Sequence, residues 1–126
     1  MPQITLEYSK NCQHNGNFYP LFKAIHNVLQ DTGGILMSNC KSRAKMLSHF
    51  YIADGDPAHA FVHLEIRFIE GRSDDIRQSI GRHCIALLKD FFQESVDNNK
   101  MQITVEIADI KRRDYSKFPH GTLTVQ

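Results

Sequence analysis

Hydrophobic and polar residues alternate in four separate stretches of the chain, at positions 3–8, 39–50, 60–68 and 102–107. Successive side chains of a β-strand point to opposite faces of a sheet, so this alternation is typical of strands with one buried face. In the second stretch the polar face is a row of three cations, the side chains at positions 41, 43 and 45. We therefore predict four strands, one of them strongly basic on one side.

Two further stretches carry apolar residues at the spacing of an amphipathic helix. The first covers residues 17–31 and is followed by a Gly-Gly pair at 33–34, a common stop signal. The second begins at Ser73, a favourable N-cap followed by two acids, and continues to about Val96. The sequence thus predicts one helix after the first strand and a longer one after the third.

The order strand-helix-strand occurs twice, on either side of a turn cluster at 54–57. This order looks like a tandem duplication of one βαβ unit, with pseudo-repeats at about 1–56 and 57–110 and a C-terminal tail at 111–126. The predicted fold class is α+β, a single domain whose four-stranded mixed sheet carries two helices on one face. We expect the open face to be apolar and to drive self-association, and the run 122–125 to form a small edge or intersubunit strand.

Composition narrows the classes of function. The chain has 126 residues, 41% of them hydrophobic, and its 15 Lys and Arg nearly balance 14 Asp and Glu. A net charge of +1 argues against the global basic field that drives binding to nucleic acid or to anionic membranes. Three widely spaced cysteines favour reduced thiols over a disulfide framework, and the apolar runs are too short for a membrane span. We expect a soluble cytoplasmic protein.

Pro2 is the first candidate for chemistry, because removal of Met1 turns its nitrogen from an amide into a free secondary amine. A terminal amine has an ordinary pKa of about 8, and burial or neighbouring cations would lower that pKa towards working pH. Pro2 would then serve as a general base. The alternating second strand places Lys41 and Arg43 on one face, where they would attract a carboxylate.

A strand that ends in Glu70-Gly71-Arg72-Ser73, followed by an acidic helix start, resembles the tautomerase superfamily, including the short single-unit 4-oxalocrotonate tautomerases. Pro2, the duplicated plan, and Ala-Asp-Gly at 53–55 followed by Ala-Phe-Val-His at 60–63 extend the resemblance over nearly the whole chain. Within the superfamily the chain is most similar to the 5-carboxymethyl-2-hydroxymuconate isomerases. The resemblance implies the fold of macrophage migration inhibitory factor.

The resemblance also implies an activity. It implies a cofactor-independent and metal-free keto-enol isomerase of homoprotocatechuate catabolism, which assembles as a homotrimer and acts on a dienol with two or three carboxylates. Pro2 would shuttle the proton, and Arg72, Lys41 and Arg43 would bind the substrate. Lys41 departs from the usual arginine, and a lysine is a point charge rather than a planar fork. That departure bears on the choice of substrate.

Other interpretations remain open at this point. Two alternatives to this isomerase are a tautomerase-fold enzyme for another unsaturated 2-oxo acid and a non-catalytic ligand-binding or interaction module in which Pro2 is never exposed. Arg72 would then brace the corner between strand and helix, and the cations would be a solvated face. His59 and His63 share a strand face, but the sequence offers them no third metal ligand.

Overall fold

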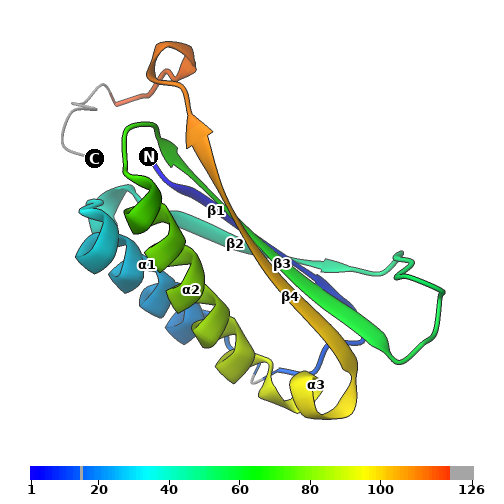
Figure 1. Cartoon of the computed structure of the whole chain (residues 1–126). Helices are drawn as coiled ribbons and strands as arrows, with labels where there is room; N and C mark the ends of the chain where they lie inside the picture. The colour runs from blue at the N-terminus through cyan, green and yellow to red at the C-terminus, as the bar shows by residue number, and fades with distance from the viewer. Residues whose placement is uncertain (15, 120–126) are drawn as a thin grey trace.

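Four strands form one mixed sheet in the computed structural model, which describes residues 1–14 and 16–119. The order across the sheet is β2-β1-β3-β4, and the strands are β1 (Gln3–Ser9), β2 (Lys41–Leu47), β3 (His59–Ile69) and β4 (Lys100–Ile110). β1 runs parallel to β2, β3 runs parallel to β4, and β1 and β3 are antiparallel. Figure 1 shows both long helices on one face of this sheet. The predicted fold class is confirmed.

The end of α1 and the start of α2 lie at the predicted signals. α1 (Tyr19–Gly33) stops at Gly34, whose positive φ of 65° suits a residue without a Cβ. α2 (Asp74–Phe91) starts at Ser73, whose hydroxyl accepts a hydrogen bond from the backbone N–H of Ile76 at 3.2 Å. Such a cap contributes about 1 kcal/mol. Two short 3₁₀ turns, η1 (Met37–Asn39) and η2 (Arg112–Asp114), flank the ends of the sheet.

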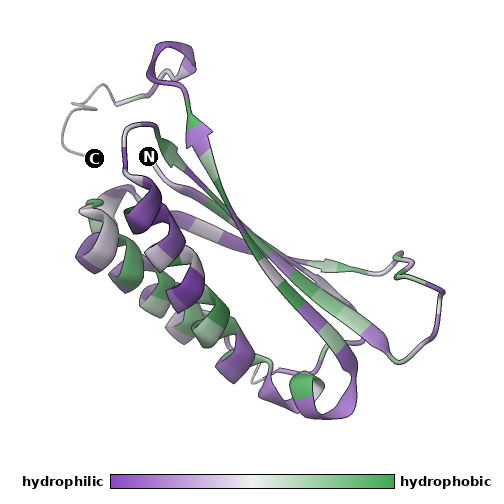
Figure 2. Cartoon of the chain, viewed as in Figure 1, coloured by the Kyte–Doolittle hydropathy of each residue, from purple (hydrophilic) through white to green (hydrophobic). Residues whose placement is uncertain are grey.

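The core lies between the helices and the sheet. Alternate residues of β1 and β3 point towards the helices and are fully buried, and Figure 2 shows hydrophobic and hydrophilic residues alternating along these strands. Each such side chain contributes about 1.5–3 kcal/mol by leaving water. The fully buried members of this layer include Ile4, Leu6, Ala60, Val62, Leu64, Ile66, Ile25, Leu29, Ile80, Cys84, Leu88 and Phe92.

Two predicted elements differ from the structure. The second helix was expected to reach about Val96, but it ends at Phe91, and a separate short helix α3 (Gln93–Asn98) follows. Adjacent residues of a helix lie about 100° apart, yet Phe91 and Phe92 are both buried, so the chain turns at Phe92 to place both rings inside. β2 is also shorter than the expected 39–50, because β1 offers no partner beyond the pair Ser9–Leu47.

The open face of the sheet is polar, and the expectation of an apolar face is wrong. β1 presents Gln3, Thr5 and Glu7 there, because its apolar residues all face the helices. The other strands also present mainly polar residues there, although Phe61 of β3 lies on this face beside Gln102. The polar residues of the described part of this face are Lys41, Arg43, Lys45, His63, Glu65, Arg67, Gln102, Thr104 and Glu106. The polar character of this face removes the reason given above for predicting self-association. The predicted strand at 122–125 lies outside the described residues.

Candidate active site

One end of the sheet gathers most of the predicted site residues. The register pairs Gln3 with Lys41 on one side and with Arg67 on the other, so the N-terminus lies between the start of β2 and the end of β3. Figure 1 shows the N-terminus beside the loop that joins β3 to α2. The last turn of α1 reaches the same end, because Gly33 accepts a hydrogen bond from Arg72.

The N-terminal amine is held in a sheltered position. Met1 is fully buried, and its amine donates a hydrogen bond to the backbone carbonyl of Asn39 at 2.9 Å. Burial and then the charges of Lys41 and Lys117 lower the pKa of this amine from 8.0 to about 6, against a small opposing effect of Cys40. The amine is therefore mostly neutral at pH 7, the state that a general base requires.

Pro2 is fixed next to this amine by the sheet. Its carbonyl accepts a hydrogen bond from the backbone N–H of Lys41 at 3.3 Å, which ties it to the first residue of β2. Continuing the β1–β3 register by one residue places Pro2 beside Phe68. With Met1 present the Pro2 nitrogen is an amide, so the base at this position in the unprocessed chain is the amine of Met1.

Two lysines approach the amine, and only one of them was predicted. Lys41 Nζ donates to the backbone carbonyl of Asn39 at 3.1 Å, and Lys117 Nζ lies 3.5 Å from the side-chain oxygen Oδ1 of the same residue. Lys117 belongs to the segment after η2 and is separated from Asn39 by 78 positions in the sequence. Its only sequence signal is a basic residue in a tail, which does not reveal that the chain returns over the N-terminus.

Arg43 lies on the same strand face as Lys41, one step further from the amine. It is exposed, and its Nη1 donates to Oε1 of Gln3 at 2.5 Å. This hydrogen bond turns the guanidinium towards the residue that follows Pro2. Lys45 continues the row opposite Glu7, further along the sheet. The structure thus orders the three cations of β2 by their distance along the strand from the N-terminus.

Arg72 is held on the helix side of the same end. Its Nε donates to the carbonyl of Gly33 at 2.7 Å, Nη1 lies 3.5 Å from the carbonyl of Ile69, and the guanidinium lies 5.2 Å from the ring centre of Phe68. Burial lowers the pKa of Arg72 from its ordinary value, although an arginine remains charged. These contacts brace the corner between β3 and α2. They use two of five N–H donors, which leaves others for a ligand.

The two histidines considered for metal binding have other partners. His59 Nε2 lies 3.0 Å from the carboxylate of Asp54, and His63 contacts Thr104 at 2.6 Å and Glu106 at 3.4 Å. Among residues 1–14 and 16–119 there is no group of three His, Cys, Asp or Glu side chains that is placed to hold a metal ion. The helices described there are also too short or too polar to cross a membrane.

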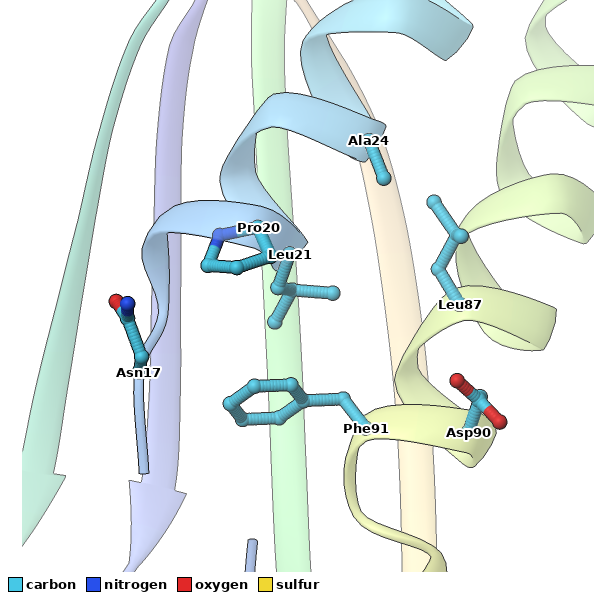
Figure 3. A pocket seen from close by; sticks show the side chains of 7 residues that line it. All are labelled: Asn17, Pro20, Leu21, Ala24, Leu87, Asp90 and Phe91. Atoms are coloured by element: carbon cyan, nitrogen blue, oxygen red, sulfur yellow. The ribbon is translucent and has the colours of Figure 1, made fainter. Parts of the chain in front are cut away.

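A hollow of about 300 Å³ lies between the two long helices, but it is separate from this chemistry. Figure 3 shows it lined by side chains from the start of α1 and the end of α2, with Asp90 at its rim. Gly33, the residue that Arg72 contacts, is at the opposite end of α1. The residues that line the hollow are Asn17, Pro20, Leu21, Ala24, Leu87, Asp90 and Phe91.

Two known isomerases are similar to this chain over most of its length. The chain is 26% identical over 110 residues to the 5-carboxymethyl-2-hydroxymuconate Delta-isomerase of Escherichia coli, an alignment that covers 87% of each protein. The crystal structure of a 5-carboxymethyl-2-hydroxymuconate isomerase from Deinococcus radiodurans R1 superposes with a TM-score of 0.82 at 28% identity, covering 92% of this chain and 87% of that one.

A more distant structure shares the fold alone. A fused 4-OT, described as a wild-type symmetric trimer, superposes with a TM-score of 0.75 at 12% identity and covers 97% of this chain and 96% of that one. The family profile described as 5-carboxymethyl-2-hydroxymuconate isomerase matches residues 2–120, nearly the whole chain. The chain therefore belongs to the 5-carboxymethyl-2-hydroxymuconate isomerase family and has a tautomerase fold.

Proposed function

We propose that this isomerase-family chain, once Met1 is removed, converts 5-carboxymethyl-2-hydroxymuconate into its 2-oxo-ene tautomer through the amine of Pro2, without a cofactor. The observation that carries the proposal is the sheltered N-terminal amine, whose pKa is lowered to about 6 by burial and two lysines. Pro2 follows Met1 directly and is tied to Lys41 through the sheet. After removal of Met1, its amine would lie close to the same two lysines.

The reaction needs one group that accepts and then returns a proton. The neutral amine of Pro2 takes the proton of the 2-hydroxyl group, and the electrons of the dienol shift along the conjugated chain as the 2-oxo group forms. The resulting ammonium gives the proton to the distant carbon, which restores the neutral amine. A base with a pKa near the working pH performs both halves efficiently.

Binding of the substrate carboxylates falls to the cations at this end of the sheet. Lys41 is the nearest predicted cation to the amine, and Arg43 follows it on the same face. Arg72 approaches from the helix side and has N–H donors beyond those that brace the corner. We assign Arg72 to a carboxylate and to the negative charge that develops at the 2-oxo group.

Removal of Met1 has two consequences for this proposal. It converts the Pro2 nitrogen into a base, and it vacates the space that the fully buried Met1 side chain occupies next to that base. We propose that the vacated space admits the substrate. Mass analysis of the natively expressed protein tests whether Met1 is removed, since a retained Met1 would leave Pro2 as an amide.

An ultraviolet assay of ketonisation tests the activity itself. The processed protein should turn over 5-carboxymethyl-2-hydroxymuconate faster than 2-hydroxymuconate, which lacks the extra carboxymethyl group. The reverse preference would favour the second candidate, an isomerase for another unsaturated 2-oxo acid, which the replacement of an arginine by Lys41 keeps open. No turnover of either compound by protein that starts at Pro2 would favour a non-catalytic binding module.

A cytoplasmic homotrimer is the assembly that we propose, and light scattering would measure its mass.

A further inference from the structure

Lys117 is a cation that the chain brings to the N-terminus from its far end. It lies beyond η2, in the last part of the described chain, and its side chain is half-buried. Its Nζ is 3.5 Å from Oδ1 of Asn39, the residue whose backbone carbonyl accepts the hydrogen bond of the N-terminal amine. The C-terminal segment therefore contributes a charged group to the candidate site.

Two lysines and the N-terminal amine converge on Asn39, which carries no charge of its own. The N-terminal amine and Lys41 both donate to its backbone carbonyl, at 2.9 and 3.1 Å, and Lys117 approaches its side chain. Within the described part of the chain, no carboxylate lies within ion-pair distance of any of the three. The two lysine charges repel each other, so an anion bound between them would be stabilised by both.

We propose that Lys117 is a substrate-binding residue, which together with Lys41 holds one carboxylate of a dicarboxylate ligand next to the N-terminal amine. The inference rests on the proposed function and extends it, because it adds a cation that sets the preference for ligands with two or more carboxylates. Charge-assisted hydrogen bonds from two lysines to one carboxylate satisfy both of its oxygens.

The same cation also acts on the base. In the chain that retains Met1, the groups that face the N-terminal amine are Lys41 from β2, Cys40 just before it, and Lys117 from the C-terminal segment. Each lysine disfavours the protonated amine and lowers its pKa, whereas Cys40 has the opposite effect. Removal of the Lys117 charge should therefore raise the pKa of the amine. The acidic limb of the pH–activity profile should then shift to higher pH.

Binding of a saturated probe separates this role from catalysis. Adipate, which has two carboxylates and no reactive double bond, should bind the full-length processed protein more tightly than hexanoate does, as measured by calorimetry. Lys117→Met should weaken adipate binding by about tenfold and hexanoate binding much less, as expected for one lost charge-assisted contact. Lys117→Arg should retain most of the affinity. Lys23→Met, which removes an exposed charge from α1, is the matched control.

Each outcome decides one of the two proposals. Wild-type affinity for adipate in Lys117→Met, or equal affinity of the wild-type protein for adipate and hexanoate, would overturn the role of Lys117. If the wild-type protein isomerises its substrate but Lys117→Met keeps the same KM and the same pH profile, the proposed function stands and the role of Lys117 fails. If the wild-type protein shows no isomerase activity, but Lys117→Met binds adipate more weakly and its amine titrates at higher pH, the role of Lys117 stands and the proposed function fails.

Discussion

In each βαβ unit, a lysine that begins the second strand makes the same backbone hydrogen bond, at opposite ends of the sheet. The two units differ in what lies next to the charge of that lysine. In the first unit the N–H of Lys41 donates to the carbonyl of Pro2, and in the second the N–H of Lys100 donates to the carbonyl of Ala58. Lys100 Nζ is paired with the carboxylate of Asp56 at 3.0 Å. Lys41 instead lies beside a second lysine and an amine.

This difference shows where the fold leaves room for an external anion. The second unit supplies its own carboxylate, so its lysine forms a surface ion pair of small energetic value. The first unit leaves its cations without such a partner in the described chain and places the N-terminal amine among them. The comparison predicts that loss of the Lys41 charge will change catalysis, whereas loss of the equivalent Lys100 charge will change only stability.

The largest effect should come from blocking the N-terminus. A protein that retains an extra residue before Pro2 has no secondary amine, and we expect kcat to fall by about 10²- to 10⁴-fold, the usual contribution of a general base. The ultraviolet ketonisation assay measures the loss, with mass analysis to establish the N-terminus of each preparation. Unchanged turnover in a fully blocked protein would contradict the role of Pro2.

The next largest effect should follow from Arg72→Ala. We expect most of the activity to disappear, by about 10²-fold, because a guanidinium that binds substrate charge is lost. Arg77→Ala is the matched control, since Arg77 also lies on Phe68, at 6.0 Å, and braces β4 through Asp109 and the carbonyl of Ile107. Both variants should lose stability and keep the oligomer, but only Arg72→Ala should lose activity. Wild-type turnover in Arg72→Ala would reduce this residue to a structural brace.

A smaller effect should follow when the first unit receives the counter-ion that the second unit has. Asn39→Asp places a carboxylate between Lys41 and Lys117, and it should raise KM by about tenfold by competing with the substrate for these cations. Lys100→Gln, which breaks the pair with Asp56, should leave KM unchanged and cost less than about 1 kcal/mol of stability. Steady-state kinetics and urea unfolding of both variants test the contrast. Equal KM values in Asn39→Asp and the wild type would contradict it.

The smallest effect concerns the pH dependence of stability in protein that retains Met1. Burial lowers the pKa of its amine from 8.0 to about 6, so between these values the unfolded chain binds more protons than the folded chain. Stability should therefore rise as pH increases from about 6 to 8 and be lost on acidification through the same range. Because the amine remains partly solvated, we expect about 1 kcal/mol. An acetylated N-terminus should abolish this dependence in unfolding experiments.

The strands were predictable from sequence because each has one buried face. β1 and β3 contact helices on one side only, so their apolar residues alternate strictly and reveal both the strand and its inward face. The break at Phe92 was not predictable, because phenylalanines are compatible with a continuing helix and only the tertiary core demands that two adjacent rings be buried. The limits proposed for the two pseudo-repeats stay a prediction.

The candidate site was predictable only in part. Lys41 could be found because strand alternation and the family resemblance both point to it, and the structure places it next to the N-terminal amine. Lys117 could not be found, since its position depends on the path of a segment that carries no periodic signal. The roles of Pro2, Arg72 and Arg43 stay predictions, and their tests are given above.

The central claim is that Pro2 is a neutral base because its amine is sheltered and lies near cations that have no carboxylate partner among residues 1–14 and 16–119. The most direct measurement is an NMR titration of the Pro2 amine in processed protein, compared with the pH profile of kcat/KM. The account predicts an amine pKa well below the ordinary value of about 8, coincident with the acidic limb of the profile. A Pro2 amine that titrates at or above about 8, or an acidic limb that does not follow it, would contradict the account.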